Sequence, residues 1–419
     1  MKIKIKHISR IEGHAGFIGH LLNGNVKKAK IEIEEGARLI EGILVGRHFS
    51  EAPIITARIC GICPVIHNLT SIKAIENALN IKVRKDVILA RKLMLAGQII
   101  QSHTLHLFFL SLPDFLNYST DLSQIKKYPL QTEEALEIRE FANKIIETIG
   151  GRAIHPITTE IGGFKKYPTR VELKNLFQQA NRILPKAVDL AIFFKNLKYP
   201  DFYRAANFVS LTNLSEYAFY EGKIKIQNSK SKIQGPEFFL KQIQEIQEGV
   251  VKRVKYDQQV YMLGALARLN NNADQLNKEA KKILKKLNKK RPINNIFYNI
   301  FAQAVEVVHF VAECQKLLKT LMRMRMNTNL RAKFKVKAGQ GLAACEAPRG
   351  TLFHYYEINN KGLITKCNII TPTAQFLNNL EEDLKVWLPK VKKLSKRERE
   401  RRIKMLIRTY DPCITCATH

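Results

Sequence analysis

Two pairs of cysteines lie at opposite ends of this chain, and they constrain its fold more than any other feature. Cys60 and Cys63 form the first pair, and Cys413 and Cys416 form the second. The spacing within each pair suits one metal, and four thiolates select zinc, nickel, copper(I) or iron-sulfur iron over hard cations. In a zinc ribbon the second pair usually follows within roughly 15–20 residues, whereas Cys413 lies 350 positions after Cys63. Most of the chain must therefore fold before the site closes, which favours a buried catalytic metal over a structural one.

The composition is that of a globular chain. Its 419 residues, of which 45% are hydrophobic, suffice for one large domain or two intimate ones. No charge-free apolar run of about 18 residues is found, so we expect no direct membrane insertion. The N-terminus alternates lysine and isoleucine and lacks the apolar core of a secretory signal, and seven cysteines do not indicate a disulfide framework. A cytoplasmic location is therefore expected.

A formal net charge of +32 is unusual, and it brings nucleic-acid binding or acidic partners into consideration. Lysine and arginine are dense at 281–290 and 385–408, where isoleucine and leucine recur at helical spacing. Such stretches are typical of amphipathic helices with a solvated basic face. We therefore expect no binding to nucleic acid, and a docking surface for acidic partner subunits accounts for the charge better.

The apolar periodicity predicts an α+β fold that is mainly α, with long helices in a bundle and small peripheral sheets. Residues 1–35 alternate apolar and polar positions around Asn23-Gly24-Asn25, which predicts an antiparallel hairpin. A second β element is expected at 351–371, with a turn at 359–362. Helices are predicted at about 37–46, 64–79, 86–111, 133–149, 172–197, 236–288 with breaks, 292–325 and 377–407. The expected organisation is the hairpin at 1–35, a helical core at about 37–330 and a C-terminal β and helix segment at about 331–419.

Six sequence blocks resemble the large subunit of nickel-iron hydrogenases, and they occur in the same order. They are RIEGH at 10–14, RICGICPVIH at 58–67, GRAIHP at 151–156 with GGF at 162–164, EAPRG at 346–350, PTAQ at 372–375 and DPCITCATH at 411–419. The likeness covers the full length of the chain. It implies the fold of that subunit as a single domain over 1–419, and the reversible heterolytic cleavage of dihydrogen to protons and electrons.

The resemblance implies that all four cysteines hold nickel. Cys60 and Cys413 would be terminal ligands, and Cys63 and Cys416 would bridge to an iron that carries carbon monoxide and cyanide. Pro64 favours the first turn of a helix, and the free N–H groups there are expected to lower the pKa of the first cysteine pair. Four thiolates and two cyanides around two divalent metals leave a dianion, which needs compensation when it is buried.

Arg349 is expected to provide that compensation, because its planar guanidinium suits a hydrogen bond to a cyanide above the open metal position. Thr373, which follows Pro372 in the same block, offers a hydroxyl to the other cyanide. Respiratory members of the family carry a carboxylate in a His-Asp-His sequence where this chain reads QSH at 101–103. Asp411 is therefore expected to orient Arg349 alone. Phe376 stands where the resemblance leads us to expect asparagine.

Cleavage of dihydrogen needs a base close to the metal, and the terminal thiolate of Cys413 is expected to serve. Glu12 is then the expected first proton relay; the alternative is an ion pair with Arg10 or Arg58. His67 is expected to hydrogen-bond a bridging sulfur and tune its basicity. A core histidine with satisfied hydrogen bonds is the alternative for that residue.

The resemblance also implies a second metal site. Glu41, the imidazole of His419 and the backbone carbonyl of Ile369 match positions that hold magnesium or iron(II). Histidine favours a transition metal over magnesium, and the identity of the ion stays open.

Electrons released from dihydrogen need an exit. Cys314, Cys345 and Cys367 lack the spacing of an iron-sulfur cluster, and no Gly-rich dinucleotide fingerprint is visible. An iron-sulfur small subunit is therefore expected as a partner. The stretch 102–115 looks like the cytoplasmic, bidirectional branch that includes sulfhydrogenase alpha subunits, which implies further flavin- and NAD(P)-binding and iron-sulfur electron-transfer subunits in a hetero-oligomer.

Two alternative functions remain at this stage. One is a hydrogen sensor, with the same site in a regulatory complex and with incidental turnover. The other is a structural zinc protein or a nucleic-acid-binding protein that uses the same thiolates and the basic charge. Metal analysis separates the last class from the others, and turnover with a soluble electron acceptor separates an enzyme from a sensor.

Overall fold

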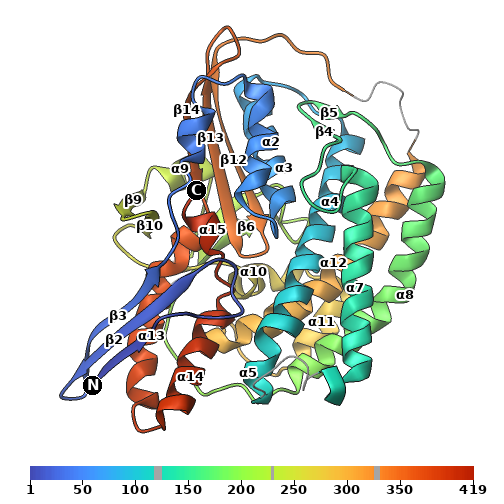
Figure 1. Ribbon diagram of the computed structural model, residues 1–419. Helices are drawn as coiled ribbons and strands as arrows, with labels where there is room; N and C mark the ends of the chain where they lie inside the picture. Colours follow the sequence, from blue (N-terminus) through green and yellow to red (C-terminus); the bar gives the residue numbers. More distant parts are fainter. Residues whose placement is uncertain (118–124, 228–230, 325–330) are drawn as a thin grey trace.

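The computed structural model describes residues 1–117, 125–227, 231–324 and 331–419. Four long helices lie side by side at one side of the molecule (Figure 1). They are α4 (Lys85–Thr104), α7 (Pro129–Gly150), α8 (Arg170–Lys195) and α12 (Asn299–Arg323). Small sheets and shorter helices make up the other side, so the prediction of a mainly α, α+β fold is confirmed.

The helices α3 (Pro64–Ala78), α7 and α8 begin and end within four residues of the predicted positions. α3 is the helix predicted at 64–79, and α8 begins in a capping box between Thr169 and Glu172. α4 continues through a π-helical turn, Leu105–Ser111, into α5 (Leu112–Leu116). The stretch Lys85–Leu116 is long and apolar enough to cross a membrane, but 78% of its most apolar window is buried within the protein. That burial is typical of the core helix of a globular domain.

Both predicted β elements are present, and each has one more strand than expected. β2 (Ala15–Leu22) and β3 (Asn25–Ile33) form the hairpin around Asn23, and β1 (Lys2–Ile5) pairs with β2. β13 (Gly350–Ile358) and β14 (Ile364–Ile370) form the second element, and β12 (Gly339–Ala347) pairs antiparallel with β13.

The helix prediction for 236–288 is wrong in its middle part. This part forms a hairpin of β9 (Ile243–Glu248) and β10 (Val251–Tyr256), followed by β11 (Tyr261–Met262). Glutamate, glutamine and lysine favour helices in isolation, but Gly249 has a positive φ in the turn. Arg253 of β10 also pairs with Glu248 of β9 at 2.8 Å. The turn and the cross-strand pairs outweigh helix propensity here.

The helix predicted at 377–407 is two helices, α13 (Pro372–Val391) and α14 (Lys396–Thr409). The side chain of Ser395 accepts a hydrogen bond from the backbone of Glu398, so a new N-cap begins inside the stretch that looked continuous. The helix predicted at 37–46 is shorter, α1 (Ile40–Leu44), and α12 begins seven residues after the predicted start at 292. The predicted end of that helix at 325 and the boundary near 330 lie outside the described residues.

The helical core expected at 37–330 therefore contains strands as well. Besides β9 to β11 these are β4 (Thr159–Glu160), β5 (Gly163–Phe164), β6 (Asn207–Thr212), β7 (Lys223–Gln227) and β8 (Lys232–Gln234). The short helices are α2 (Ala52–Thr56), α9 (Pro236–Leu240), α10 (Ala265–Asn272), α11 (Lys278–Lys285) and α15 (Ile414–Ala417).

α3 packs unusually close to β12. A Cβ atom built on Gly341 of β12 would overlap the backbone of Ala74 and Ala78 in α3, and a Cβ on Gly339 would overlap the carbonyl of Ala78. Only glycine permits this approach of two backbones. Because Cys63 is the N-cap residue of α3, the same contact helps to place the first cysteine pair relative to the sheet.

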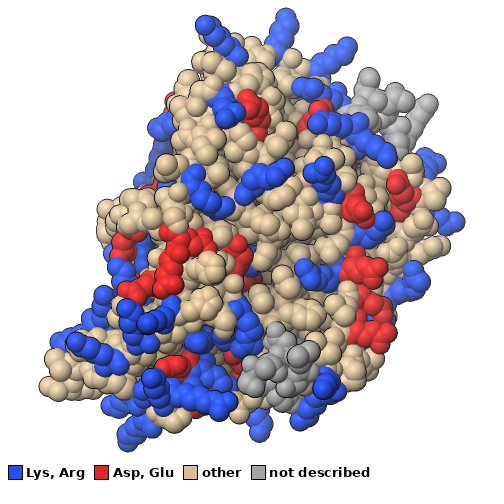
Figure 2. Space-filling model, in the orientation of Figure 1, with Lys and Arg blue, Asp and Glu red and all other residues tan. Residues whose placement is uncertain are grey.

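Lysine and arginine side chains are spread over most of the face seen in Figure 2, and fewer acidic side chains gather at the left and along the right side. The charge on this face is not concentrated in one groove or stripe. The expectation that the chain does not bind nucleic acid stays a prediction.

Gly341→Ala tests the contact between α3 and β12. The added methyl group must push the two backbones apart, so we expect the free energy of unfolding to fall by about 1–3 kcal/mol. Chemical denaturation of the purified protein measures this change. Gly42→Ala is the matched control, because a Cβ at Gly42 meets no atom within 4 Å. Equal stability of the two variants would contradict the proposed role of the contact.

Candidate metal centre

The structure brings the four cysteines together. Cys63 lies at the start of α3 with Cys60 just before it, and Cys413 and Cys416 lie at and within α15. All four are buried, and their sulfur atoms lie within 4.8 Å of one another. The Sγ atoms of Cys60 and Cys413 are 3.5 Å apart, and those of Cys63 and Cys416 are 3.3 Å apart. This compact set of four soft ligands fits a thiophilic metal centre.

Backbone contacts between the two ends of the chain close the site. The amide of Ile414 donates to the carbonyl of Glu12 at 2.9 Å, and the amide of Arg38 donates to the carbonyl of Thr418 at 3.0 Å. α15 consequently lies in the middle of the molecule, close to the N-terminal segment, although it ends the chain (Figure 1).

The sulfur atoms differ in acidity. Hydrogen bonds, first of all from Cys413, hold the pKa of Cys60 well below its usual value, whereas burial raises the pKa of Cys413 and Cys416 well above theirs. The hydrogen bond from Cys413 lowers the pKa of Cys63. Burial and the charge of Cys60 act in the opposite direction, and the pKa of Cys63 is raised overall. The expectation of low pKa values for both cysteines of the first pair is thus wrong for Cys63. Four thiolates can share this space only when a cation compensates them.

Arg349 is buried and interacts electrostatically with three of the cysteines, Cys413, Cys63 and Cys60. Its Nε donates to the carbonyl of Asp411 at 2.7 Å, and its Nη2 donates to Oδ1 of Asp411 at 2.8 Å. Burial opposes the guanidinium charge, but Asp411 first and then the sulfur of Cys413 hold its pKa well above the usual value. Its Nη1 is buried without a hydrogen-bond partner among the described residues. An unpaired donor beside four thiols fits an anionic ligand on a bound metal.

In the described ranges both hydrogen bonds of Arg349 go to Asp411, and Asp411 is itself held by further side chains. Nε2 of Gln303 donates to Oδ2 of Asp411 at 3.3 Å, and Nδ1 of His106 lies 2.6 Å from Oε1 of Gln303. Gln303 belongs to α12 and His106 to the π-helical turn after α4. In the sequence both positions look like ordinary buried positions of a core helix. No motif in the sequence pointed to Gln303, whereas His106 lies in the stretch 102–115 that carried the branch resemblance.

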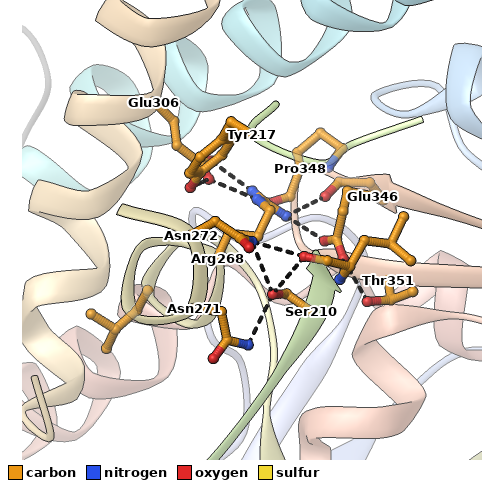
Figure 3. A network of polar contacts seen from close by, with 12 residues as sticks. Ser210, Tyr217, Arg268, Asn271, Asn272, Glu306, Glu346, Pro348 and Thr351 are labelled. Atoms are coloured by element: carbon orange, nitrogen blue, oxygen red, sulfur yellow. Dashed lines mark hydrogen bonds and ion pairs between the residues drawn. The ribbon is translucent and has the colours of Figure 1, made fainter. Parts of the chain in front are cut away.

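A second buried network holds the backbone just before Arg349 (Figure 3). Arg268 of α10 pairs with both carboxylate oxygens of Glu306 at 2.7 and 2.6 Å, and with Glu346 at 2.9 Å. Its Nη1 and Nη2 also donate to the carbonyls of Ala347 and Pro348, at 2.8 and 2.9 Å. These bonds use all the N–H groups of a guanidinium that is fully buried. Arg268 could not be predicted as a site residue, because nothing in the sequence places it opposite these carbonyls.

Thr373 and Pro372 lie at the start of α13, where proline occupies the first turn. Oγ1 of Thr373 accepts a hydrogen bond from the amide of Cys413 at 3.1 Å. Its hydroxyl hydrogen remains able to donate to an acceptor in the site. Phe376, one turn further along α13, is buried beside Tyr410.

Glu12 reaches the second cysteine pair directly. Its Oε2 lies 2.9 Å from the Sγ of Cys413, and its Oε1 accepts from the hydroxyl of Thr415 at 2.5 Å. Burial raises the pKa of this carboxyl, and the neighbouring Cys60 adds to the shift. Arg10, the alternative partner weighed for Glu12, instead donates to Asp114 at 2.7 Å. The geometry suits proton exchange between sulfur and carboxyl.

His67 projects from α3 toward Cys416. Its Nε2 lies 3.7 Å from the Sγ of Cys416, and its Nδ1 lies 3.4 Å from Nε2 of His354. Burial lowers the pKa of His67 to about 3. The ring is therefore a neutral imidazole that contacts both a sulfur and a second histidine.

The residues expected at a second metal site also converge. Nε2 of His419 lies 2.9 Å from the carbonyl oxygen of Ile369 and 3.8 Å from Oε1 of Glu41. Burial opposes the charge of Glu41, but hydrogen bonds from His419 and Lys252 lower its pKa to about 2. Nζ of Lys252 lies 2.5 Å from the same Oε1. The donor set fits a divalent cation, which would share the carboxylate with the ammonium group or displace it.

The three remaining cysteines are inert. Burial raises the pKa of Cys314, Cys345 and Cys367. In the described ranges the four site cysteines are the one group of three or more His, Cys, Asp or Glu side chains close enough together to hold a metal, and none of the three remaining cysteines belongs to it.

Comparisons with known proteins cover both cysteine pairs. The family described as nickel-dependent hydrogenase matches residues 38–133 and 204–419. Sulfhydrogenase 2 subunit alpha of Pyrococcus furiosus is 32% identical over 100% of this chain and 99% of its own. The NAD-reducing hydrogenase HoxS subunit beta of Cupriavidus necator is 26% identical over 100% of this chain and 94% of its own. A solved structure of an NAD+-reducing NiFe-hydrogenase in the H2-reduced state superposes with a TM-score of 0.92 at 25% identity, covering 100% of this chain and 99% of that one.

Arg268→Lys tests whether the second network positions Arg349. Lysine cannot hold two carboxylates and two carbonyls at once, so we expect stability to fall by about 3 kcal/mol and turnover per bound nickel to fall by about 10²-fold. Arg91→Lys is the matched control, because Arg91 is equally buried and pairs with Glu76 away from Arg349. Equal turnover per nickel in both variants would leave Arg268 with a purely structural role.

Proposed function

This chain belongs to the nickel-dependent hydrogenase family, and from that premise we propose how its residues carry out the cleavage of dihydrogen as the large, catalytic subunit. The observation that carries the proposal is the set of four buried sulfur atoms within 4.8 Å of one another. The unpaired Nη1 of Arg349 supports it, because that donor suits a cyanide ligand. Cys60 and Cys413 would hold the metal as terminal ligands, and Cys63 and Cys416 would serve as the bridging ones.

When bound, the nickel-iron centre supplies the Lewis acidity and the redox capacity that split dihydrogen. Sγ of Cys413 receives the proton in this proposal, because it is a terminal thiolate with a carboxyl 2.9 Å away. Glu12 then takes the proton on Oε2, and burial, which raises the pKa of this carboxyl, favours its protonated form. The hydroxyl and amide of Thr415 hold the carboxyl in place at 2.5 and 3.2 Å.

Arg349 and Asp411 form the opposite wall of the site. The guanidinium compensates the negative charge of the centre, and Asp411 fixes its plane through two hydrogen bonds. Pro372 and Thr373 complete this wall, with the Thr373 hydroxyl as a donor to the second cyanide.

Electrons leave through an iron-sulfur small subunit in this proposal. Gly61 and Arg58 are exposed on either side of buried Cys60, so the ligand loop reaches the surface. Exposed Ile54 and Ile154 flank it, and Nδ1 of His155 bonds the carbonyl of Ala57 at 3.0 Å, which joins the two segments. Exposed isoleucines next to an exposed ligand loop suit burial under a partner subunit. The NAD-reducing relatives support transfer onward to flavin- and NAD(P)-binding subunits in the cytoplasm.

The second metal site is proposed at Glu41, His419 and the carbonyl of Ile369. A divalent ion there, magnesium or iron(II), would tie α1 and the C-terminus to β14 and so stabilise the segment that carries Cys413 and Cys416.

Metal analysis and infrared spectroscopy of the purified complex test the proposed centre. We expect about one nickel and at least one iron per chain, together with carbonyl and cyanide stretching bands.

Cys60→Ser and Cys413→Ser should abolish turnover, because a hard oxygen replaces a soft terminal ligand. Zinc alone in the natively matured protein, or turnover of either variant at the level of the unmodified protein, would refute the proposal. Intact bands with only trace turnover would favour a sensor.

Glu12→Gln tests the proton relay. The amide keeps the size of the side chain but cannot carry a proton, so metal content and infrared bands should persist while deuterium exchange between heavy water and dihydrogen falls by about 10²-fold or more. Glu51→Gln, on the exposed pair with Arg47, is the control and should exchange at the normal rate. Normal exchange in Glu12→Gln would show that protons leave by another route.

A further inference from the structure

A row of buried polar groups extends from the bridging sulfur of Cys416 into the protein. Sγ of Cys416 lies 3.7 Å from Nε2 of His67, and Nδ1 of His67 lies 3.4 Å from Nε2 of His354. Nδ1 of His354 lies 3.0 Å from the hydroxyl of Tyr356, which lies 2.9 Å from Oγ of Ser71. Each of these five side chains is buried. The proposed mechanism gives no role to His354, Tyr356 or Ser71.

Two packed elements supply the row. His67 and Ser71 are four residues apart and share one face of α3, while His354 and Tyr356 are two residues apart and share one face of β13. α3 and β13 pack against each other. The step of four residues from His67 to Ser71 advances about 6 Å along α3. The step of two residues from His354 to Tyr356 advances about 6.8 Å along β13. The two periods therefore match well enough to interleave the four side chains.

The sulfur determines the direction of the hydrogen bonds. A thiolate that binds metal carries no proton, so Nε2 of His67 must be the donor when it bonds to Cys416. In a neutral imidazole Nδ1 of His67 is then the acceptor, and Nε2 of His354 is its donor. Nδ1 of His354 in turn accepts from the hydroxyl of Tyr356, which accepts from Ser71. Every hydrogen bond in the row runs toward the sulfur.

Both rings are buried, and among the described residues neither has a carboxylate as a hydrogen-bond partner, so both are neutral. With neutral rings the opposite direction would turn the lone pair of Nε2 of His67 toward the thiolate, which is repulsive. Bonds that run in one direction also polarise one another. The row ends at Ser71, which is buried, so the hydrogen bonds serve to orient the side chains of the row.

We propose that His354 and Tyr356 are positioning residues that fix the tautomer of His67, so that its Nε2–H donates to the sulfur of Cys416 and withdraws electron density from it. This inference rests on the proposed role of Cys416 as a bridging ligand. Hydrogen bonds to metal-bound sulfur raise reduction potentials and weaken donation from sulfur to the metal. His354 and Tyr356 thus set the electronic state of the centre without contacting it.

Tyr356→Phe in the assembled, metal-loaded complex tests the proposal, because it removes a single hydroxyl from the row. We expect the carbonyl band to move to lower wavenumber and the midpoint potential of the centre to become more negative, with metal content unchanged. His354→Phe removes both ring nitrogens and should give the same shift or a larger one. Ser71→Ala should shift the band in the same direction by a smaller amount.

Tyr355→Phe is the matched control. Tyr355 is the neighbour on the other face of β13, and its hydroxyl bonds Gln340 and Glu357. We expect its bands and potential to equal those of the unmodified complex. If Tyr356→Phe and Ser71→Ala both keep the carbonyl band and the potential of the unmodified complex, the row has no electronic role and the proposal is overturned. Absence of diatomic bands in the unmodified complex would instead refute the proposed centre itself.

Discussion

The hydrogen bond from the amide of Ile414 to the carbonyl of Glu12 joins the two ends of the chain, and the site depends on it. The bond places Glu12 beside Cys413, and it brings the second cysteine pair to the first. Closing so large a loop costs conformational entropy, which the buried core between the two ends must offset. The centre is consequently a property of the whole fold, because no local segment contains more than two of its ligands.

Buried cations make this arrangement electrostatically tolerable. Arg349 and Arg268 are both buried, and each is held by carboxylates and by backbone carbonyls. A buried charge without a partner would cost several kcal/mol. Arg268 has every donor satisfied and acts on the backbone, whereas Arg349 keeps one donor unpaired. Arg268 therefore fixes the backbone, and Arg349 remains able to contact a ligand.

Local and periodic features of this chain could be predicted from its sequence. The turn at Asn23 and the helix after Cys63 have signals that lie within a few residues, namely Asn-Gly and a proline at the first helical position. The hairpin of β9 and β10 could not be predicted in this way, because its strands consist of good helix formers and depend on the turn at Gly249 and on cross-strand ion pairs. The new N-cap at Ser395 was hidden inside a continuous amphipathic pattern.

The same distinction applies to the site. Residues inside motifs, such as the four cysteines and Arg349, were found because their spacing or their neighbours carry the signal. Gln303, Arg268 and Lys252 act across the fold on groups far away in sequence, and their own neighbours are ordinary helix or strand residues. Such supporting positions are visible only when the backbone is known, since hydrogen-bond complementarity between distant segments has no sequence period.

The two cysteines of the C-terminal pair face different chemical groups. Cys413 contacts the carboxyl of Glu12, whose pKa is raised by burial, and Cys416 contacts the neutral ring of His67. A carboxyl in contact with a thiol can exchange a proton with it, whereas an imidazole held by a second histidine serves best as a fixed donor. Because α15 separates the two sulfur atoms by one helical turn, one side of the centre is suited to proton transfer and the other to setting its electron density. A substitution on either side should therefore change one property and spare the other.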